Sequence, residues 1–211
     1  MSWFSETRQT FLVDIAYNGM PIYVYVAPES TPSETAGTTP AVMLPAQFRS
    51  ELERGIESLR KGHYGAAEKT LTKLLPKTHD NPDVLYNLGL AELGLQRNDQ
   101  ARSDFQRALA TDPNHELTLV ALAQMEMRNG SPAAAIPYLE KAASSGATSW
   151  RTDFDLATAN TKLDRLSEAE SAASRAVRLA RNQNAGPAYL LGQSSSRRAS
   201  GRMPSLPGSR C

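Results

Sequence analysis

The chain has 211 residues, of which 40% are hydrophobic and 21% are charged, and its net charge at pH 7 is +1. This length accommodates one domain with extensions or two small domains, and the apolar content is sufficient for a sizeable core. The near-neutral charge argues against nucleic-acid binding, which usually requires a basic surface. The single cysteine, Cys211, excludes an intrachain disulfide and a paired-cysteine metal site.

The sequence contains no recognisable membrane-directing signal. No apolar run approaches the roughly 18 residues that a transmembrane helix needs. The N-terminal residues also lack the basic and then apolar pattern of a signal peptide. We therefore expect a cytoplasmic protein. The N-terminal region does not resemble the start of a natural domain, which is also compatible with a chain that continues upstream.

Residues 1–26 are predicted to contain a β-hairpin. Apolar residues alternate along 11–17 and again along 20–26, and Asn18-Gly19 between them is a typical two-residue turn. This turn pairs Tyr17 with Met20 and Phe11 with Val26. Because an isolated two-stranded hairpin is marginally stable in water, we expect its apolar face to need a partner surface.

Residues 27–47 are predicted to be a linker. Four prolines and many serines and threonines interrupt regular structure and leave little to bury.

A pattern of residue types repeats through the following region. A shift of 34 positions aligns Leu88 with Leu122, and Leu122 with Leu156. A fixed period of this length is typical of tandem helix-turn-helix repeats. Small residues recur where two helices of a repeat would cross, at Gly55, Gly89, Ala123 and Ala157 on the first helix and at Ala67, Ala101, Ala135 and Ala169 on the second. The pattern predicts four repeats, at 48–81, 82–115, 116–149 and 150–183.

The pattern weakens after the fourth repeat. Residues 184–192 resemble the opening of a fifth repeat, and residues 193–211 replace its apolar periodicity with Ser, Arg, Gly and Pro. That composition predicts a disordered basic tail. The array would then end in an uncapped edge available for self-association, and a truncated or frame-altered gene product is one explanation.

No residue pattern indicates catalysis. The three histidines, His63, His79 and His115, fall in predicted turns far apart, and no metal-binding or phosphate-binding motif is present. We therefore predict no catalytic residue, no metal and no cofactor.

The repeated residues resemble the tetratricopeptide repeat family, which has small residues at repeat positions 8, 20 and 27 and often proline at position 32. This resemblance implies an all-α fold, a right-handed α-solenoid of four helix-turn-helix repeats, here preceded by the small β-hairpin segment. It also implies a concave groove lined by positions 2, 5, 6, 9, 12 and 13 of each first helix.

The groove positions imply a partner-binding surface. Family members that clamp a chaperone's C-terminal carboxylate carry Lys or Asn at four set positions. In this sequence Leu52, Ile56 and Asp83 occupy three of these positions, and only Asn87 matches. We therefore do not expect a carboxylate clamp. What remains is an apolar stripe with positive charge toward its C-terminal end. The partner-binding residues so implied are Leu52, Ile56, Tyr86, Asn87, Leu90, Val120, Gln124, Met127, Arg128, Arg151, Phe154 and Lys162.

The function that these features favour is a non-catalytic protein–protein interaction scaffold that binds a peptide or helix of a partner. An alternative is an accessory repeat region of a larger enzyme, such as a transferase, whose catalytic domain is absent from this chain. A third possibility, an assembly or secretion factor at a cell envelope, needs an upstream signal sequence. A further hypothesis is that the acidic, apolar hairpin folds onto the groove as an internal ligand.

Overall fold

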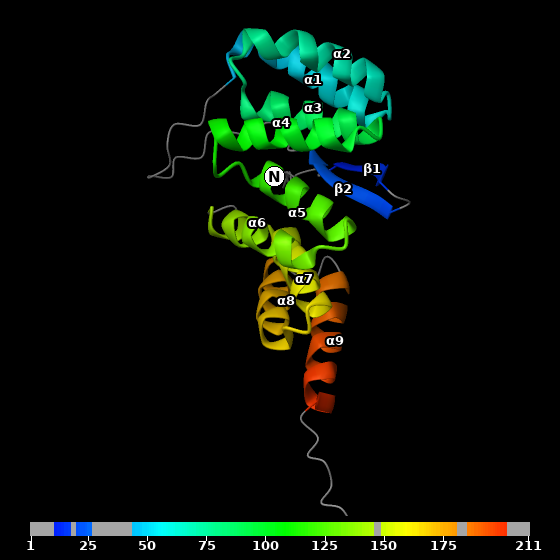
Figure 1. The fold of residues 1–211 in the computed structure, drawn as a ribbon, viewed down its shortest axis with the longest axis vertical. Coiled ribbons are helices and arrows are strands. Elements are labelled where there is room, and N and C mark those ends of the chain that lie inside the picture. Colours follow the sequence, from blue (N-terminus) through cyan, green and yellow to red (C-terminus); the bar gives the residue numbers. More distant parts are fainter. Residues whose placement is uncertain (1–10, 18–19, 27–43, 146–148, 181–184, 202–211) are drawn as a thin grey trace, which may run out of the picture. The chain divides into compact units, whose positions relative to one another are not determined.

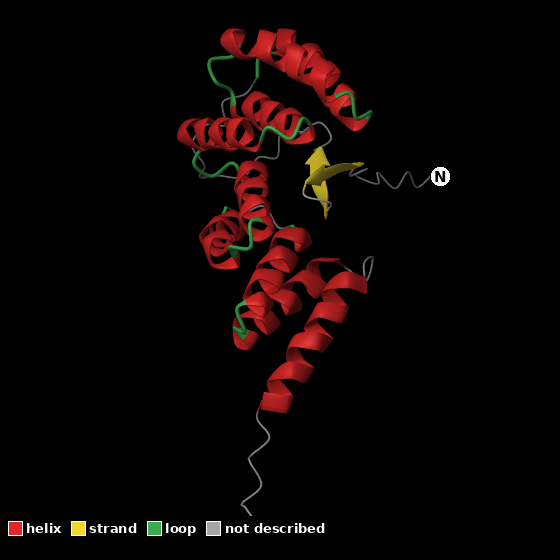
Figure 2. Ribbon diagram, turned by 45° about the vertical axis from the view of Figure 1, so that its right-hand side comes forward, coloured by secondary structure: helices red, strands yellow, loops and turns green. Residues whose placement is uncertain are grey.

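The computed structural model describes residues 11–17, 20–26, 44–145, 149–180 and 185–201 (Figure 1). The described chain is helical apart from two short strands (Figure 2). It divides into two compact units, Met1–Ala121 and Leu122–Cys211.

The first unit holds both strands and two pairs of helices. The strands are β1 (Phe11–Tyr17) and β2 (Met20–Val26). The first pair is α1 (Ala46–Arg60) and α2 (Tyr64–Leu74), followed by a short 3-10 helix, η1 (Leu75–Lys77). The second pair is α3 (Pro82–Gly94) and α4 (Asn98–Thr111). Helix α5 (Glu116–Arg128) runs across the boundary at Ala121.

The second unit continues with α6 (Pro132–Ser144), α7 (Trp150–Lys162) and α8 (Leu166–Ala180). It ends with α9 (Ala185–Gly201). Helix α7 packs against α6 and α8, and α9 packs against both α7 and α8.

The same turn ends α1, α3, α5 and α7. One residue in each turn has a positive φ, with values of 73°, 63°, 76° and 56° at Gly62, Gln96, Gly130 and Asp164. The N–H of the following residue donates to a carbonyl five residues earlier, at 2.9 Å in all four turns. This geometry is the Schellman C-cap, which satisfies carbonyls that the helix end leaves unpaired. The period of the sequence pattern is therefore also a period of the backbone.

Small residues set the close approach of helices in the first unit. A Cβ built on Gly55 would lie 2.7 Å from Leu71 Cδ2, and one built on Gly94 would lie 2.3 Å from the ring of Tyr64. Leu71 is fully buried. The helices consequently pack backbone against side chain, as the small residues at Gly55 and Gly89 predict.

Alanine dominates the core of the second unit. Its buried cluster comprises Ala123, Ala135, Ile136, Leu139, Leu156, Ala157, Ala159, Ala172, Ala173 and Leu190. Short side chains at these positions allow α5, α6, α7 and α8 to approach one another closely, and Leu190 adds α9 to the same core.

The predicted disordered tail at 193–211 differs from the structure, because α9 continues to Gly201. Ser194 is buried, accepts or donates a hydrogen bond with Thr161 at 3.3 Å, and lies one turn after buried Leu190. Arg197 pairs with Asp164, and Arg198 pairs with Glu170. The composition of this segment does not reveal these partners, which lie in the turn after α7 (Asp164) and on α8 (Glu170), and this is why the prediction failed. Residues 202–211 lie outside the described residues.

The structure also differs from the uncapped C-terminal edge that the sequence predicts, because α9 packs against α8 and α7. The partial fifth repeat predicted at 184–192 is thus the first part of a longer terminal helix. Such a helix covers the apolar side of the last pair, which is the usual role of a capping helix in a repeat array.

The N-terminal strands pair antiparallel, with Phe11 opposite Val26, Ile15 opposite Ile22 and Tyr17 opposite Met20. The predicted turn residues Asn18 and Gly19 lie outside the described residues, as do residues 27–43 of the predicted linker. The linker prediction extends slightly too far, because α1 begins at Ala46.

Candidate partner-binding site

In the first unit, the predicted groove residues divide by burial. Leu52 and Ile56 are partly exposed on α1. On α3, by contrast, Tyr86, Asn87 and Leu90 are only 4%, 5% and 1% exposed. The face that the family resemblance implies to be open is therefore covered along α3.

Tyr86 shows how this burial arises. Its ring lies 6.1 Å from the ring of Phe105 on α4 and 5.9 Å from the ring of His115, measured between centroids. Burial, with a smaller contribution from the charge of Asp83, raises the pKa of the Tyr86 hydroxyl far above its usual range. The remaining predicted residue of this unit, Val120, is partly buried on α5.

The second unit brings several predicted residues together around one carboxylate. Gln124 Nε2 on α5 donates a hydrogen bond to Asp155 Oδ2 on α7, at 3.0 Å. Burial raises the pKa of Asp155 to about 6, while the Gln124 hydrogen bond and the positive charges of Arg128 and Arg151 act in the opposite direction. Asp155 is therefore a carboxylate held beside two arginines in a partly desolvated position.

A pair of aromatic side chains on α7 lies beside Arg151, one of the two arginines near this carboxylate. The rings of Trp150 and Phe154 meet edge to face with centroids 6.3 Å apart. The guanidinium carbon of Arg151 lies 5.1 Å from the centroid of the Trp150 ring, a cation–π arrangement. We call the resulting set the Asp155 cluster: Gln124, Arg128, Trp150, Arg151, Phe154 and Asp155.

Two other predicted residues belong to the same unit but play different parts. Met127 and Phe154, both partly buried, pack against the buried core. Lys162 is exposed at the C-terminal end of α7. Gln124, Arg128, Arg151 and Phe154 are thus the predicted residues that the structure brings into one cluster.

Trp150 and Asp155 complete the cluster and are absent from the residues inferred above. Asp155 stands at position 6 of its repeat, the position that Asn87 occupies in the second repeat, so a signal for it was present. Trp150 stands at position 1, which is not a groove position in the family. Only the geometry of the N-terminus of α7 identifies it.

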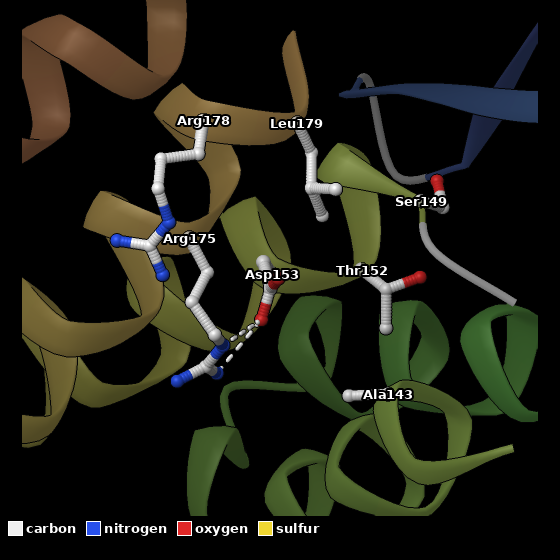
Figure 3. A pocket seen from close by; sticks show the side chains of 7 residues that line it. All are labelled: Ala143, Ser149, Thr152, Asp153, Arg175, Arg178 and Leu179. Carbon is white, nitrogen blue, oxygen red and sulfur yellow. Dashed lines mark hydrogen bonds and ion pairs between the residues drawn. The ribbon is translucent and has the colours of Figure 1, made fainter. Parts of the chain in front are cut away.

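A separate pocket of about 260 Å³ lies between α6, α7 and α8 (Figure 3). Its main polar group is already paired, because Arg175 Nε donates to Asp153 Oδ1 at 2.8 Å. Helix geometry places Asp153 on a different face of α7 from Arg151 and Asp155. The lining residues are Ala143, Ser149, Thr152, Asp153, Arg175, Arg178 and Leu179. The pocket is therefore distinct from the Asp155 cluster.

The described residues contain no group of three or more potential metal ligands. Among the helices that the structure describes, none is long and apolar enough to cross a membrane. The histidines do not converge either: His115 bonds Thr118 Oγ1 through Nδ1 at 2.7 Å and Asp83 Oδ1 through Nε2 at 3.2 Å. This histidine is partly buried rather than an exposed turn residue, and it connects α3 with the start of α5.

Comparison with known proteins gives a consistent family assignment. A family model described as Tetratricopeptide repeat matches residues 52–116 and 120–185. No curated protein matches the sequence.

Solved structures share the fold at low sequence identity. MamA from Desulfovibrio magneticus RS-1, residues 41 to the end, is 20% identical with a TM-score of 0.62, covering 74% of this chain and 88% of that one. MamA of strain AMB-1 is 22% identical with a TM-score of 0.59, covering 72% and 83%. PilF of Pseudomonas aeruginosa is 17% identical with a TM-score of 0.66, covering 72% and 69%. These likenesses establish a fold shared with helical repeat proteins.

Proposed function

Because this chain belongs to the tetratricopeptide repeat family, we propose that it is a non-catalytic scaffold that binds a protein partner through its repeats. The repeats of this proposal are those of the sequence pattern, at 48–81, 82–115, 116–149 and 150–183. The partner is a peptide segment or helix rather than a small molecule, since repeat arrays offer extended surfaces for recognition.

The Asp155 cluster is the observation that carries the proposal. It combines two arginines with one carboxylate, so its formal charge remains positive even when Asp155 is ionised. Lys162 adds a further exposed cation on the same helix. Aromatic and arginine side chains are the residue types that contribute most energy to protein interfaces. A partly exposed group of both types is thus suited to a partner.

The same residues indicate the chemistry of the partner. The arginines favour a carboxylate, which a guanidinium group binds with two parallel hydrogen bonds when the geometry allows. Trp150 and Phe154 favour an apolar or aromatic side chain next to it. We therefore infer that the partner segment carries an acidic residue close to an apolar anchor.

Selection of peptides from a random library tests this proposal. Peptides retained by the wild-type chain should be enriched in an acidic residue adjacent to an apolar one. Arg128→Ala/Arg151→Ala should weaken their binding at least tenfold. Arg165→Ala/Arg178→Ala removes the same charge from the same unit and is the matched control. Equal loss in both variants, or no loss in either, would contradict the assignment of the site.

A further inference from the structure

Helix α3 is buried around its whole circumference. Every residue from Val84 to Leu93 is buried, including the polar Asn87 and Glu92. A repeat helix with one face on its neighbours and one face in solvent shows alternating burial. Helix α7 of the second unit does so, since Phe154, Asp155 and Thr158 are partly exposed and Lys162 is exposed. The burial of α3 thus extends to the side that a repeat helix usually leaves in solvent.

An element outside the helix pairs also packs against α3, namely the N-terminal strand β1. In addition to α2 and α4, which flank it as neighbours along the chain, α3 packs against α1 and β1. Strand β1 also packs against α1. Helices α1 and α3 are the first helices of the first two repeats, and they carry the predicted groove residues Leu52, Ile56, Asn87 and Leu90.

The hairpin has the composition of an apolar ligand. The register joins Phe11 to Val26, Val13 to Val24, and Ile15 to Ile22, so one alternate row of cross-strand pairs is apolar throughout. A two-stranded sheet of this size is marginally stable by itself in water. A surface that buries its apolar residues would therefore stabilise it.

We propose that the N-terminal hairpin is an internal ligand of the α1–α3 face, so that this face is occupied in the free protein. The connection along the chain favours this. Only 19 residues separate the end of β2 at Val26 from the start of α1 at Ala46, so the hairpin and this face are tethered in one chain. Such a tether holds the hairpin at a millimolar effective concentration. An intrinsic dissociation constant on the order of 0.1 mM is then enough to keep about nine-tenths of the molecules closed.

While the hairpin occupies the α1–α3 face, an outside partner cannot bind to that face. A segment that binds α1 and α3 must displace the hairpin, so its apparent dissociation constant equals its intrinsic dissociation constant divided by the fraction of molecules that are open. The residues of the Asp155 cluster are not part of this face, since they lie on α5 and α7 within the other unit. The inference does not depend on the function proposed above.

Distance measurement between two spin labels tests the proposal in the full chain. With Cys211→Ser as background, Asn18→Cys places one label between the two strands in sequence, and Glu57→Cys places the other at an exposed position of α1. Docking predicts a single narrow distance distribution. A tethered but undocked hairpin predicts a broad distribution over tens of ångströms, on the scale of the tether.

Matched variants make the result specific. Val13→Asp/Val24→Asp, which charges one cross-strand pair, should broaden the distribution, whereas Thr31→Asp/Thr38→Asp, with the same charge change in the connecting segment, should not. Circular dichroism verifies that the helices remain folded in both. A broad distribution in the parent chain, or a narrow one that survives Val13→Asp/Val24→Asp, would overturn the proposal.

A mixture of singly labelled chains distinguishes internal docking from docking between copies. A defined distance between Asn18→Cys on one chain and Glu57→Cys on another would also overturn the intramolecular form. None of these measurements requires a partner peptide, so their failure would leave the proposed scaffold function untouched.

Discussion

Gly89 on α3 faces the ring of Phe105 on α4 so closely that a Cβ at residue 89 would lie 2.5 Å from Phe105 Cε1. Phe105 is fully buried and also contacts Tyr86. The ring cannot move away without disturbing the rest of the first unit, because interiors of this kind are packed at crystal-like density. A single absent methyl group thus sets the spacing of the second helix pair.

Gly89→Ala should therefore destabilise the chain by up to about 2 kcal/mol. Alanine gains about 1 kcal/mol in helix propensity, but overpacking against Phe105 costs roughly 1–3 kcal/mol. Gly65→Ala on α2 is the control, since a Cβ there meets nothing within 4 Å. Chemical unfolding of both variants measures the difference. Equal stability of the two would show that Phe105 yields without cost.

The turn at Gln96 offers a stabilising substitution. Gln96 has φ 63° in a turn whose counterparts in the first and third repeats are glycines. Glycine reaches this left-handed region without the steric penalty of other residues. Gln96→Gly should raise the free energy of unfolding by about 0.5–1 kcal/mol. Gln100→Gly, at an exposed position of α4, should lower the free energy of unfolding by a similar amount. A decrease for Gln96→Gly would contradict the capping role of this turn.

Glu92 makes the stability of the first unit depend on pH. Burial raises its pKa to about 7, as do the charges of Asp104 and Glu68, while Arg97 and Arg107 oppose the shift. Because the folded pKa lies above the ordinary value of 4.5, Glu92 favours folding below pH 4.5. That contribution is lost as pH rises toward 7.

Glu92→Gln should therefore leave the stability nearly unchanged at pH 4.5 and increase it at pH 8. Thermal unfolding at the two pH values measures this difference, with Glu53→Gln at an exposed carboxylate of α1 as the control. If Glu92→Gln increased the stability equally at pH 4.5 and at pH 8, the effect would come from packing and not from ionisation.

The hydrogen bond between Gln124 and Asp155 should be visible in a titration. It stabilises the ionised carboxylate and so lowers the pKa of Asp155, which burial has raised to about 6. Gln124→Ala should raise that pKa further, as followed by NMR of the carboxyl carbon. Ser174→Ala on α8 leaves this pair intact and is the control. An unchanged or lowered pKa in Gln124→Ala would show that this hydrogen bond does not form in solution.

Leu190 should anchor α9 to the second unit. It is 7% exposed and belongs to the buried cluster, whereas its neighbour Tyr189 is 74% exposed. Leu190→Ala should cost about 2–3 kcal/mol, in the range for buried leucines. Tyr189→Ala should cost less than about 0.5 kcal/mol. Hydrogen exchange across 185–201 would show whether the loss is confined to α9, and equal effects of the two variants would contradict the anchoring.

The helical repeats could be predicted because their signal is local and repeated. Small residues such as Gly55 and Gly89, and the shared register of Leu88 and Leu122, each reflect a contact inside one helix pair. Helix α9 escaped prediction for the opposite reason. Its arginines are stabilised by Asp164 and Glu170, which lie on other elements far away in sequence, and composition alone makes such a segment look disordered.

The candidate site was predictable only in part. Family positions identify Arg128 and Arg151, but no pattern indicates that Trp150 lies 5.1 Å beneath the guanidinium of Arg151. Position alone also does not foresee the burial of Leu90, because exposure of a repeat helix depends on what else in the chain covers it. Both differences arise from packing between elements, which a periodic pattern does not encode.

The contrast between the two cores has a calorimetric consequence. Leucine and phenylalanine fill the first unit, while alanines supply much of the interior of the second. The heat capacity change of unfolding grows with the apolar area exposed, so the alanine-rich half should contribute less to it per residue. Its stability curve against temperature should accordingly be the flatter of the two.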